Sequence, residues 1–475
     1  MSELKKQITF PGLIALGMGG IVGTSWIYTN SRFFAKYGAG GEIFGFLLAT
    51  LLATFIALAY AELSTAFPRA GGEVVYTYVA LGKGWSFAAG WALIGAYLSS
   101  LAFYVAAAGW LFSWAIPQIE SGPYYMIAGM KIYVSELIIG VALALLITWL
   151  NYVGIKSVSI AQIVMVSIKI LLGLTLVAVG FGVGKVGNFW PAWSPDMNPT
   201  LATLRFVLPA MTYLTGFELV AVMAEEANMP PRRIGLGVIS SVILAGLFYT
   251  IVLLSSAWVI PWQDTAKMEL GTIDAFKAAG FPALSIAAYL ISLLGLGTAF
   301  LGLFAATPRL ILSLARAKIL PESFTKTHPK YGTPINAIYL TLAFAVGLGW
   351  LGKRAIIWFL DIGGFTVAAA WILAVISLFV IRKKYPNLER PYKVSSMFYP
   401  IIGAIMAGLI AISTLIPGTD LSLEWPYEYI ILAVWIVVGF ILYLYSPRGE
   451  EKEALKELLG PEYSKIAGEK GDKDE

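Results

Sequence analysis

The sequence predicts an all-α integral membrane protein with twelve transmembrane helices, and three observations lead to this fold class. First, the 475 residues are 58% hydrophobic and only 13% charged, with a mean hydropathy of +0.77, whereas a soluble protein of this length needs far more surface charge. Second, the apolar residues gather into runs of about twenty, the length at which a helix crosses a hydrocarbon core. Third, two runs carry glycine or proline at their middle, which is typical of helices that line a cavity within the membrane.

The twelve runs follow one another almost to the end of the chain. The eighth, from Ala275 to about Leu314, is long enough to tilt or to carry an extra turn. The runs centre near Ile21, Thr54, Tyr97, Ala144, Leu171, Thr215, Phe248, Leu296, Ala343, Ala368, Ile405 and Trp435.

The loops differ in charge on the two sides of the membrane. Twelve crossings put both termini on one side, and most of the 33 lysines and arginines fall in loops on that side. Cationic loops mark the cytoplasmic side, so we expect a multi-pass protein of the plasma membrane with both termini in the cytoplasm. Residues 1–7 are then a cytoplasmic N-terminus and residues 447–475 a cytoplasmic tail, with one possible helix at 450–459 and disorder at its end. The net charge of +5 follows from this topology, so the expected partner is the lipid bilayer and not nucleic acid.

Composition and spacing also exclude several classes of function. The chain has no cysteine and one histidine, His328, which lies in a basic loop. Disulfides and thiol catalysis are excluded, and no metal centre is expected. No span shows a nucleophile–base pair or paired carboxylates at catalytic spacing, so we expect neither an enzyme nor a cofactor. No span carries the continuous polar stripe that a channel needs.

Two spans carry signals of an interrupted helix. The first span has four glycines between Gly17 and Gly23, and each weakens a helix by about 1 kcal/mol relative to alanine. The sixth span has Pro209, which lacks a backbone donor, and then Gly216. For one span alone, close packing of helices explains the glycines as well. Two breaks at corresponding positions favour a cavity between them.

The spacing of these two spans predicts internal repeats. They are five spans apart, and an odd number of spans per repeat places the two halves in opposite orientations across the membrane. Residues 8–184 then form a first repeat and residues 200–382 a second, with residues 397–446 forming two appended spans. Inverted repeats with paired discontinuous helices are typical of secondary transporters, with the substrate site at the repeat interface.

Four motifs in this order resemble the amino acid–polyamine–organocation superfamily of transporters. The glycine-rich first span resembles its GxGIxG element. The others resemble the approach to its third span, the acidic-then-basic loop after its sixth span, and the connection after its eighth span. These three are Pro68 to Gly72 with Tyr76, Tyr78, Gly82, Gly84, Gly90 and Trp91; Glu225 to Arg233; and Arg316 to Pro321 with Tyr331 to Pro334.

The resemblance implies a LeuT-type fold, a five-plus-five inverted repeat with discontinuous first and sixth helices. It also implies an α-amino acid or related amine as substrate, with its carboxylate on first-span amides and its amine and side chain on the sixth span. The N-terminal end of a half-helix independently favours an anion, because its N–H groups are unpaired. The residues carried over are Gly19, Gly20, Ile21, Val22, Gly23 and Thr24 for the carboxylate, and Met211, Thr212, Tyr213, Leu214 and Phe217 for the amine and side-chain pocket.

One position departs from the superfamily. Many relatives place an aromatic lid four positions before the sixth-span glycine, where this chain has Thr212. The alternatives are that Tyr213 or Phe217 covers the substrate, or that the pocket is larger.

Lys169 lies in the middle of the fifth span, Ile160 to Phe181, which contains no acidic residue. An ammonium at that depth is costly without a partner, so a functional role is the default expectation. Several superfamily members carry such a lysine in place of a sodium ion, bonded to first-span carbonyls that correspond here to Gly17 to Gly20. The stretch Gly295 to Ala306 offers one hydroxyl, that of Thr298, so the expected coupling ion is a proton and not sodium. Proton carrier and permanently charged tether both remain open for Lys169.

Two acids complete the candidate site. Glu218 follows the sixth-span break and is expected to titrate as a gate, to attract cationic substrates, or to be a neutral, hydrogen-bonded structural acid. Asp361, near the outer end of the tenth span, is a candidate gate or cap.

These features predict a secondary active transporter of amino acids that works by alternating access. It is either a proton-coupled symporter with Lys169 in place of a sodium ion, or an amino acid/amine exchanger with Lys169 as a tether. A non-transporting scaffold or receptor is a further alternative, although it needs no broken helices. The amino acid carried and the oligomeric state are not predicted.

Overall fold

The protein is built almost entirely of helices. The computed structural model describes residues 4–127, 129–195, 197–447 and 449–471, so residues 1–3 and 472–475 of the two predicted terminal segments lie outside the described residues. The helices are α1 (Phe10–Ile21), α2 (Trp26–Ala66), α3 (Glu73–Leu81), α4 (Lys83–Ser113), α5 (Val134–Val153), α6 (Ile155–Val183), α7 (Val186–Phe189), α8 (Pro199–Tyr213), α9 (Glu218–Val222), α10 (Pro231–Val259), α11 (Trp262–Thr265), α12 (Gly271–Ala278), α13 (Pro282–Arg316), α14 (Ile335–Gly349), α15 (Gly352–Lys384), α16 (Phe398–Leu415), α17 (Tyr427–Leu444), α18 (Glu451–Leu459) and α19 (Ser464–Gly471).

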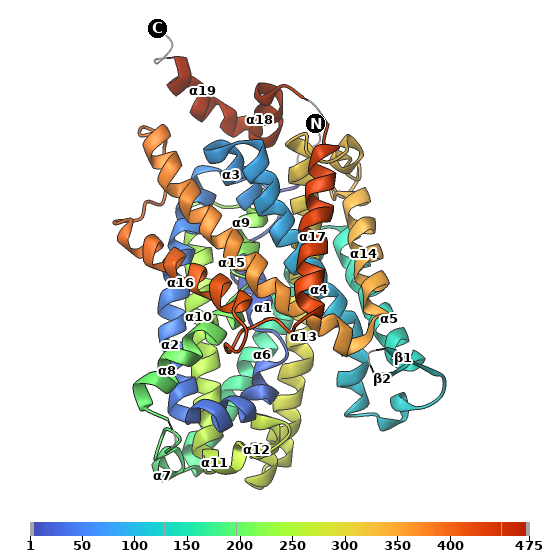
Figure 1. Ribbon diagram of the computed structural model, residues 1–475, viewed down its shortest axis with the longest axis vertical. Helices are drawn as coiled ribbons and strands as arrows, with labels where there is room; N and C mark the ends of the chain where they lie inside the picture. The colour runs from blue at the N-terminus through green and yellow to red at the C-terminus, as the bar shows by residue number, and fades with distance from the viewer. Residues whose placement is uncertain (1–3, 128, 196, 448, 472–475) are drawn as a thin grey trace.

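Short elements connect the long helices, most of which run along the length of the molecule (Figure 1). One antiparallel hairpin, β1 (Tyr124–Ile127) with β2 (Met130–Tyr133), lies between α4 and α5. Single 3-10 turns occur at Pro117–Glu120, Ala224–Glu226, Glu322–Thr325 and Gly460–Tyr463.

Ten helical stretches of the described chain are long and apolar enough to cross a membrane, counting α8 and α9 as one. Two further apolar helices are shorter, α1 with 12 residues and α14 with 15. The most apolar window of α17 is only 17% buried inside the protein, so most of its side chains face outward. Exposed apolar surface on this scale requires lipid around it. The chain is a multi-pass membrane protein.

The predicted eighth run differs from the structure at its start. Ala275 belongs to α12, which is a separate short helix, and the spanning helix α13 begins at Pro282. The chain turns between them at Gly280, whose φ of +89° suits glycine and ends α12. Pro282 then starts α13 because its fixed φ fits the first helical turn.

Both predicted interruptions are present, but the first is displaced from the glycine run. Helix α1 continues through Gly17 to Gly20 and ends at Ile21, and residues 22–25 separate it from α2. The glycines inside α1 serve close packing instead: a Cβ at Gly17 would lie 2.2 Å from Ser241 Oγ, and one at Gly20 would lie 2.3 Å from Leu219 Cδ1. The second interruption, residues 214–217, separates α8 from α9.

Helix α2 is bent once along its 41 residues. The bend lies at Gly38, where φ is +73° and a Cβ would come within 2.7 Å of Trp193 Cα. Only glycine fits such a position without strain. The bend therefore divides α2 into a first part, which follows the first interruption, and a longer second part.

One end of the molecule carries α3, α18 and α19 and is called the terminal end here (Figure 1). Buried ion pairs close it: Arg316 donates to both oxygens of Glu225 at 2.7 and 3.0 Å, and Arg309 to both oxygens of Glu226 at 2.8 and 3.0 Å. Burial alone would raise the pKa of Glu225, but Arg316 and Arg69 lower it to about 2. The α13 helix is thus fixed to the segment that follows α9.

The chain's tail packs against this same end. Arg69 Nε donates to the Leu458 carbonyl at 3.2 Å, and Lys318 pairs with Glu457 at 2.7 Å. The helix predicted at 450–459 is present as α18. Beyond it, Ser464–Gly471 form α19, in which Ile466 is buried. The predicted disorder at the end of the tail falls on residues 472–475, which lie outside the described residues. The apolar side chains that α18 buries are Ala454, Leu455, Leu458 and Leu459.

Away from the terminal end, the loop of residues 416–426 between α16 and α17 makes a second ionic link. Asp420 Oδ1 lies 2.8 Å from Lys36 Nζ on α2 and 3.0 Å from Arg205 on α8. Burial alone would raise the pKa of Asp420, but hydrogen bonds from Lys36, Arg205 and Tyr37 hold it below its usual value.

Candidate functional site

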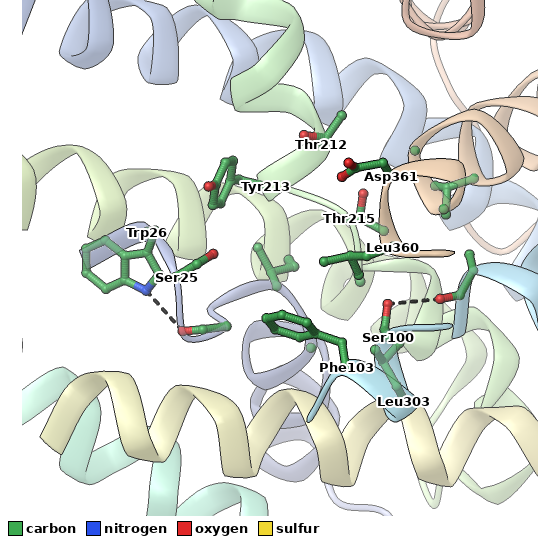
Figure 2. Close-up of a pocket in the computed structure, with 18 of the residues that line it drawn as sticks. Ser25, Trp26, Ser100, Phe103, Thr212, Tyr213, Thr215, Leu303, Leu360 and Asp361 are labelled. Carbon is green, nitrogen blue, oxygen red and sulfur yellow. Dashed lines mark hydrogen bonds between the residues drawn. The ribbon is translucent and has the colours of Figure 1, made fainter. Parts of the chain in front are cut away.

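A cavity of about 400 Å³ lies between the two interruptions and extends to the loop of residues 416–426. Its walls come from the segments that join α1 to α2 and α8 to α9, from α4, and from α15 (Figure 2). The lining residues that matter below are Gly20, Ile21, Gly23, Thr24, Ser25, Trp26, Tyr97, Ser100, Phe103, Tyr104, Thr212, Tyr213, Thr215, Gly216, Tyr249, Leu360 and Asp361.

The second interruption contacts the C-terminal end of α1, directly before the first interruption, through its backbone. Gly216 has φ +122°, and a Cβ there would lie 2.7 Å from the Gly20 carbonyl carbon and 2.8 Å from Ile21 N. Real side chains never approach that closely, so only glycine allows the two segments to meet. The paired breaks, five spans apart in the sequence, predicted that the first and sixth spans meet.

The first interruption presents the start of a long helix to the cavity. Ser25 is the N-cap of α2 and makes no side-chain capping bond. Tyr28 N donates to the Ser25 carbonyl at 3.1 Å, whereas the amides of Trp26 and Ile27 have no partner among the described residues. Thr24 is fixed to α13, because its hydroxyl lies 2.8 Å from Ser292 Oγ and its carbonyl accepts from the same Oγ at 3.0 Å. The arrangement can hold a small anion at the helix terminus.

Not all of the residues predicted for the carboxylate line this cavity. Gly20, Ile21, Gly23 and Thr24 do. Gly19 does not, because it faces α6, where a Cβ would lie 2.4 Å from Gln162 Oε1.

Val22 does not line the cavity either, since its carbonyl points toward Lys169. Ser25 and Trp26 do line it and were not predicted. Their signal was present in the sequence, because a serine directly before an apolar run is a common N-cap.

On the sixth-span side, the cavity is lined by Thr212, Tyr213, Thr215 and Gly216. Met211, Leu214 and Phe217, which were also predicted, are fully buried and lie outside the lining. The reason is that α8 continues to Tyr213, so successive side chains point to different faces of the helix.

Aromatic side chains form much of the wall, and they bear on the choice of a lid. Tyr213 faces the cavity, with its hydroxyl 3.3 Å from Thr29 Oγ1 (Figure 2). Phe217 instead stacks on Trp371 with ring centroids 5.5 Å apart. Of the two predicted alternatives, only Tyr213 is in a position to cover a ligand.

Other aromatic lining residues were not predicted. Phe103 and Tyr104 come from α4, and Tyr249 comes from α10 and donates to the Ile21 carbonyl. No local sequence signal distinguishes them from ordinary apolar residues of a span. Their position follows from packing between helices far apart in the chain.

Lys169 is buried on α6 beside the first interruption. Its Nζ donates to the Val22 carbonyl at 2.7 Å and to Thr298 Oγ1 at 2.7 Å. The predicted partners, the carbonyls of Gly17 to Gly20, are wrong because they lie within the continuous part of α1, and Val22 is the first residue beyond it. Lys169 therefore connects the cavity-lining segment of the first span to α6 and α13.

Glu218 is buried at the start of α9, directly after the second interruption. Its Oε2 accepts from Gly216 N at 3.0 Å, while Oε1 has no hydrogen-bond partner among the described residues. Tyr97 of α4 and Trp371 of α15 face the same carboxyl group. Glu218 does not line the cavity itself, but two of its neighbours, Gly216 and Tyr97, do.

Asp361 lines the cavity on α15 (Figure 2). Its carboxyl group hydrogen-bonds to that of Glu428 on α17, and Glu428 Oε2 also accepts from Glu424 N at 2.6 Å. Two carboxyl groups can bond in this way only when they share a proton. The appended helix α17 thus reaches the edge of the cavity.

Comparison with known proteins gives a consistent picture over most of the chain. Residues 8–441 match the family described as Amino acid permease. The chain is 30% identical over 459 residues to the methylthioribose transporter of Bacillus subtilis, covering 94% of each protein. It is 26% identical over 461 residues to the branched-chain amino acid permease BcaP of Lactococcus lactis, covering 94% of this chain and 95% of that protein. It is 29% identical over 414 residues to cationic amino acid transporter 3 of Arabidopsis thaliana, covering 82% of this chain and 64% of that protein.

Proposed function

Because the chain belongs to the amino acid permease family, whose members are membrane transport proteins and not enzymes, we propose that it is a secondary active transporter of amino acids. It works by alternating access with proton symport. The observation that carries the proposal is the direct contact of two interrupted helices at a cavity of about 400 Å³. Free backbone groups within a membrane are tolerated where they line a binding cavity.

The proposed architecture is twelve crossings with a five-plus-five inverted repeat. α1 with the first part of α2 is the first crossing, and α8 with α9 is the sixth. The helix pairs that pack together support the repeat: α6 packs on α13 and α15 packs on α4, which are the fifth–eighth and tenth–third pairs. Likewise α4 packs on α5 and α13 on α14, the third–fourth and eighth–ninth pairs. A shift of five crossings converts each pair into its counterpart.

The proposed substrate pose follows from the polarity of the helix ends. The carboxylate lies at the open N-terminus of α2, near Gly23 to Trp26, because amides and the helix dipole favour an anion there. The ammonium lies toward the C-terminal end of α8, near Thr212 and Tyr213, where carbonyls and the negative end of the dipole face the cavity. The side chain then extends toward Phe103, Leu360 and Asp361.

Lys169 takes the place of a sodium ion in this proposal. Its ammonium bridges a first-span carbonyl and an eighth-span hydroxyl, two oxygen atoms of the kind that would bind a cation. Loss of its proton would release Val22, and with it the segment that binds the carboxylate. The proton is the proposed coupling ion, with no other cofactor.

The proposed location is the plasma membrane, with the terminal end in the cytoplasm. Lysines and arginines concentrate in the connections at that end, as the positive-inside rule requires. With the ion pairs of Glu225 and Glu226 formed and the cavity reaching the loop of residues 416–426, the conformation is closed to the cytoplasm.

An exchanger is the second candidate mechanism, because the two short hydrogen bonds of Lys169 also suit a permanent tether. The substrate class has its own alternative, since one relative is named for methylthioribose, which has no carboxylate.

Uptake by the purified protein in liposomes tests these proposals. Competition by branched-chain, acidic and cationic amino acids and by methylthioribose identifies the substrate. Symport predicts accumulation driven by an inward proton gradient, whereas an exchanger transports only into liposomes preloaded with substrate. Absence of saturable transport under both conditions contradicts the proposed function.

A further inference from the structure

Five buried oxygen atoms near the second interruption have no hydrogen-bond partner among the described residues. They belong to Tyr60 on α2, Glu73 on α3, Tyr97 on α4 and Glu218 on α9, and both carboxylate oxygens of Glu73 are among them. Glu73 and Glu218 are each 0% exposed. Buried polar atoms are almost always paired, so a group of unpaired oxygens indicates a missing proton or water.

The four side chains form one cluster because α3 begins directly against α9. Gly71 N donates to the Val222 carbonyl at 3.0 Å, which brings Glu73 close to the helix that starts at Glu218. The hydroxyl of Tyr60 faces the carboxyl of Glu73, and the hydroxyl of Tyr97 faces that of Glu218. The ring of Tyr60 packs edge-on against Phe217, with centroids 5.4 Å apart.

No cation of the described residues pairs with either of these two acids. Among the ion pairs of the described residues, none includes Glu73 or Glu218. The other titratable groups that face them are Tyr60, Tyr76 and Tyr97, which are neutral. Two buried carboxylates without a cation cannot both ionise at low cost, so one of them holds a proton.

The geometry gives the two acids different surroundings. Glu218 lies next to Gly216 and Tyr97, which line the cavity. Glu73 lies in the first turn of α3, at the terminal end, where it faces the hydroxyl of Tyr60, and Tyr60 also lies near enough to Glu218 to interact with it electrostatically. Burial raises the pKa of Glu73 to about 8, although contact with Tyr60 partly opposes this effect.

We propose that Glu73 is a second proton-binding residue, which exchanges a proton with Glu218 through the hydroxyl of Tyr60. In this step Glu218 loses a proton to Tyr60 as Tyr60 passes its own proton to Glu73, so that Glu218 becomes a carboxylate and Glu73 a carboxylic acid. The proton moves between the cavity side and the terminal end without using the substrate's path. The proposal rests on proton coupling, which is part of the proposed function.

The test compares Glu73→Gln with Glu42→Gln in the full-length purified protein. Glu42 is a matched control, since it is also 0% exposed, lacks partners on both oxygens among the described residues and lies outside the cluster. Infrared difference spectra recorded below and above pH 8 detect ionisation of a carboxylic acid without any transport. Liposome assays then compare accumulation driven by a proton gradient with exchange of preloaded substrate.

The expected result is that Glu73→Gln removes the carboxyl signal that changes near pH 8, and Glu42→Gln retains it. Glu73→Gln should also lower proton-driven accumulation by about tenfold or more while exchange remains within about twofold of the wild type. If Glu73→Gln does not fold, Tyr60→Phe keeps the ring that packs on Phe217 and should slow proton-driven accumulation by about tenfold at unchanged exchange.

An unchanged carboxyl signal in Glu73→Gln overturns this inference, as does loss of the signal in Glu42→Gln instead. The infrared result is independent of transport. A wild-type protein that transports nothing but shows the Glu73 signal therefore contradicts the proposed function and leaves the proton site supported.

Discussion

The ammonium of Lys169 is enclosed, and its two hydrogen bonds reach a backbone carbonyl and a hydroxyl, not a carboxylate. Neutral dipoles offset only part of the cost of burying a charge. The carbonyl belongs to Val22, which lies between residues that line the cavity. A change at the cavity therefore reaches Lys169 through one or two peptide groups.

Replacement of Lys169 by alanine should remove the response of transport to a proton gradient. We expect proton-driven uptake by Lys169→Ala to fall about tenfold or more, because the Lys169 ammonium joins the Val22 carbonyl to Thr298 of α13. The milder change Thr298→Val removes one of the two partners and should have a smaller effect. Uptake at a series of external pH values measures both, and a wild-type profile in Lys169→Ala would contradict the role.

Substitutions at Gly23 and Gly19 should separate substrate binding from helix packing. A Cβ at Gly23 would meet only Tyr104 Oη, at 3.9 Å, so Gly23→Ala should fold normally yet place a methyl group in the cavity. We expect it to weaken substrate binding by about tenfold. Gly19→Ala would press on Gln162 and should lower thermal stability instead. Calorimetric binding and melting curves separate the two effects, and normal affinity in Gly23→Ala would place the carboxylate elsewhere.

The sequence identified the backbone side of the site more fully than its side-chain wall. Gly20, Gly23 and Thr24 were found because glycine and helix-breaking patterns are local signals. Phe103 and Tyr249 were not found because their exposure to the cavity depends on how α4 and α10 pack on distant helices. Such contacts leave no trace in the local pattern of apolar residues.

At the scale of single elements, the two interruptions depend on each other. The segment of residues 214–217 approaches α1 only because Gly216 has no side chain and adopts a positive φ. Side chains satisfy part of the backbone that the broken helices leave free: Lys169 donates to the Val22 carbonyl, and Glu218 accepts from Gly216 N.

Gly216→Ala should therefore destabilise the protein and abolish binding. The alanine would be strained at φ +122°, and its Cβ would lie 2.7 Å from the carbonyl carbon of Gly20, which together should cost about 2 kcal/mol or more. Gly182→Ala is the matched control, because a Cβ at that position in α6 meets no atom within 4 Å. Thermal melting in detergent measures both variants, and equal melting temperatures would contradict the tight contact.

The sequence predicted that both elements are interrupted, and it located the second more accurately than the first. Gly216 marks the second break because its conformation requires glycine. Gly17 and Gly20 misled the first assignment, since glycine within a helix marks a break and a close helix contact equally well. Only the partners, Ser241 and Leu219, decide between them.

At the scale of the whole molecule, the two ends carry different ionic contacts. The terminal end is closed by fully buried pairs, whereas the link at Asp420 is partly exposed. Breaking a buried pair leaves an uncompensated charge and costs about 3–5 kcal/mol. The terminal end should thus resist opening until its ion pairs separate together.

Glu225→Gln should shift the protein toward a state open at the terminal end. Because the chain has no cysteine, Thr215→Cys places one reactive group in the cavity. We expect an impermeant thiol reagent added from the terminal side to label it about tenfold faster when Glu225→Gln is also present. Glu462→Gln, which removes a half-buried pair between neighbouring residues Glu462 and Lys465, should leave the rate unchanged. Equal rates in all three proteins would contradict the closure.

The pH dependence of this closure has a definite sign. The pKa of Glu225 is lowered to about 2 from an ordinary 4.5, so its pairs stabilise the closed end at every pH above 4.5 and are lost as the pH falls toward 2. The thiolate fraction of the introduced cysteine rises with pH in every variant, so the rates are compared as a ratio. The ratio of the labelling rates of Thr215→Cys with and without Glu225→Gln should stay constant across neutral pH. A change in that ratio near neutral pH would assign the opening to another group.

Much of the overall architecture could be predicted because apolar run length and loop charge are strong signals. The structure agrees on an all-helical membrane protein, with ten long apolar stretches and two shorter helices in the described chain. The split between α12 and α13 and the folded tail were missed. Both depend on a few residues, Gly280 with Pro282 in one case and Leu458 with Ile466 in the other, whose effect is decided by what they pack against.

One carboxylate, that of Asp420, holds Lys36 on the first part of α2 and Arg205 on α8 at once. In the proposed architecture these two helices belong to opposite repeats, while Asp420 belongs to neither. The loop between α16 and α17 therefore couples the two helices mechanically. While both ion pairs hold, a displacement of α2 or of α8 during transport must be accompanied by a displacement of the other.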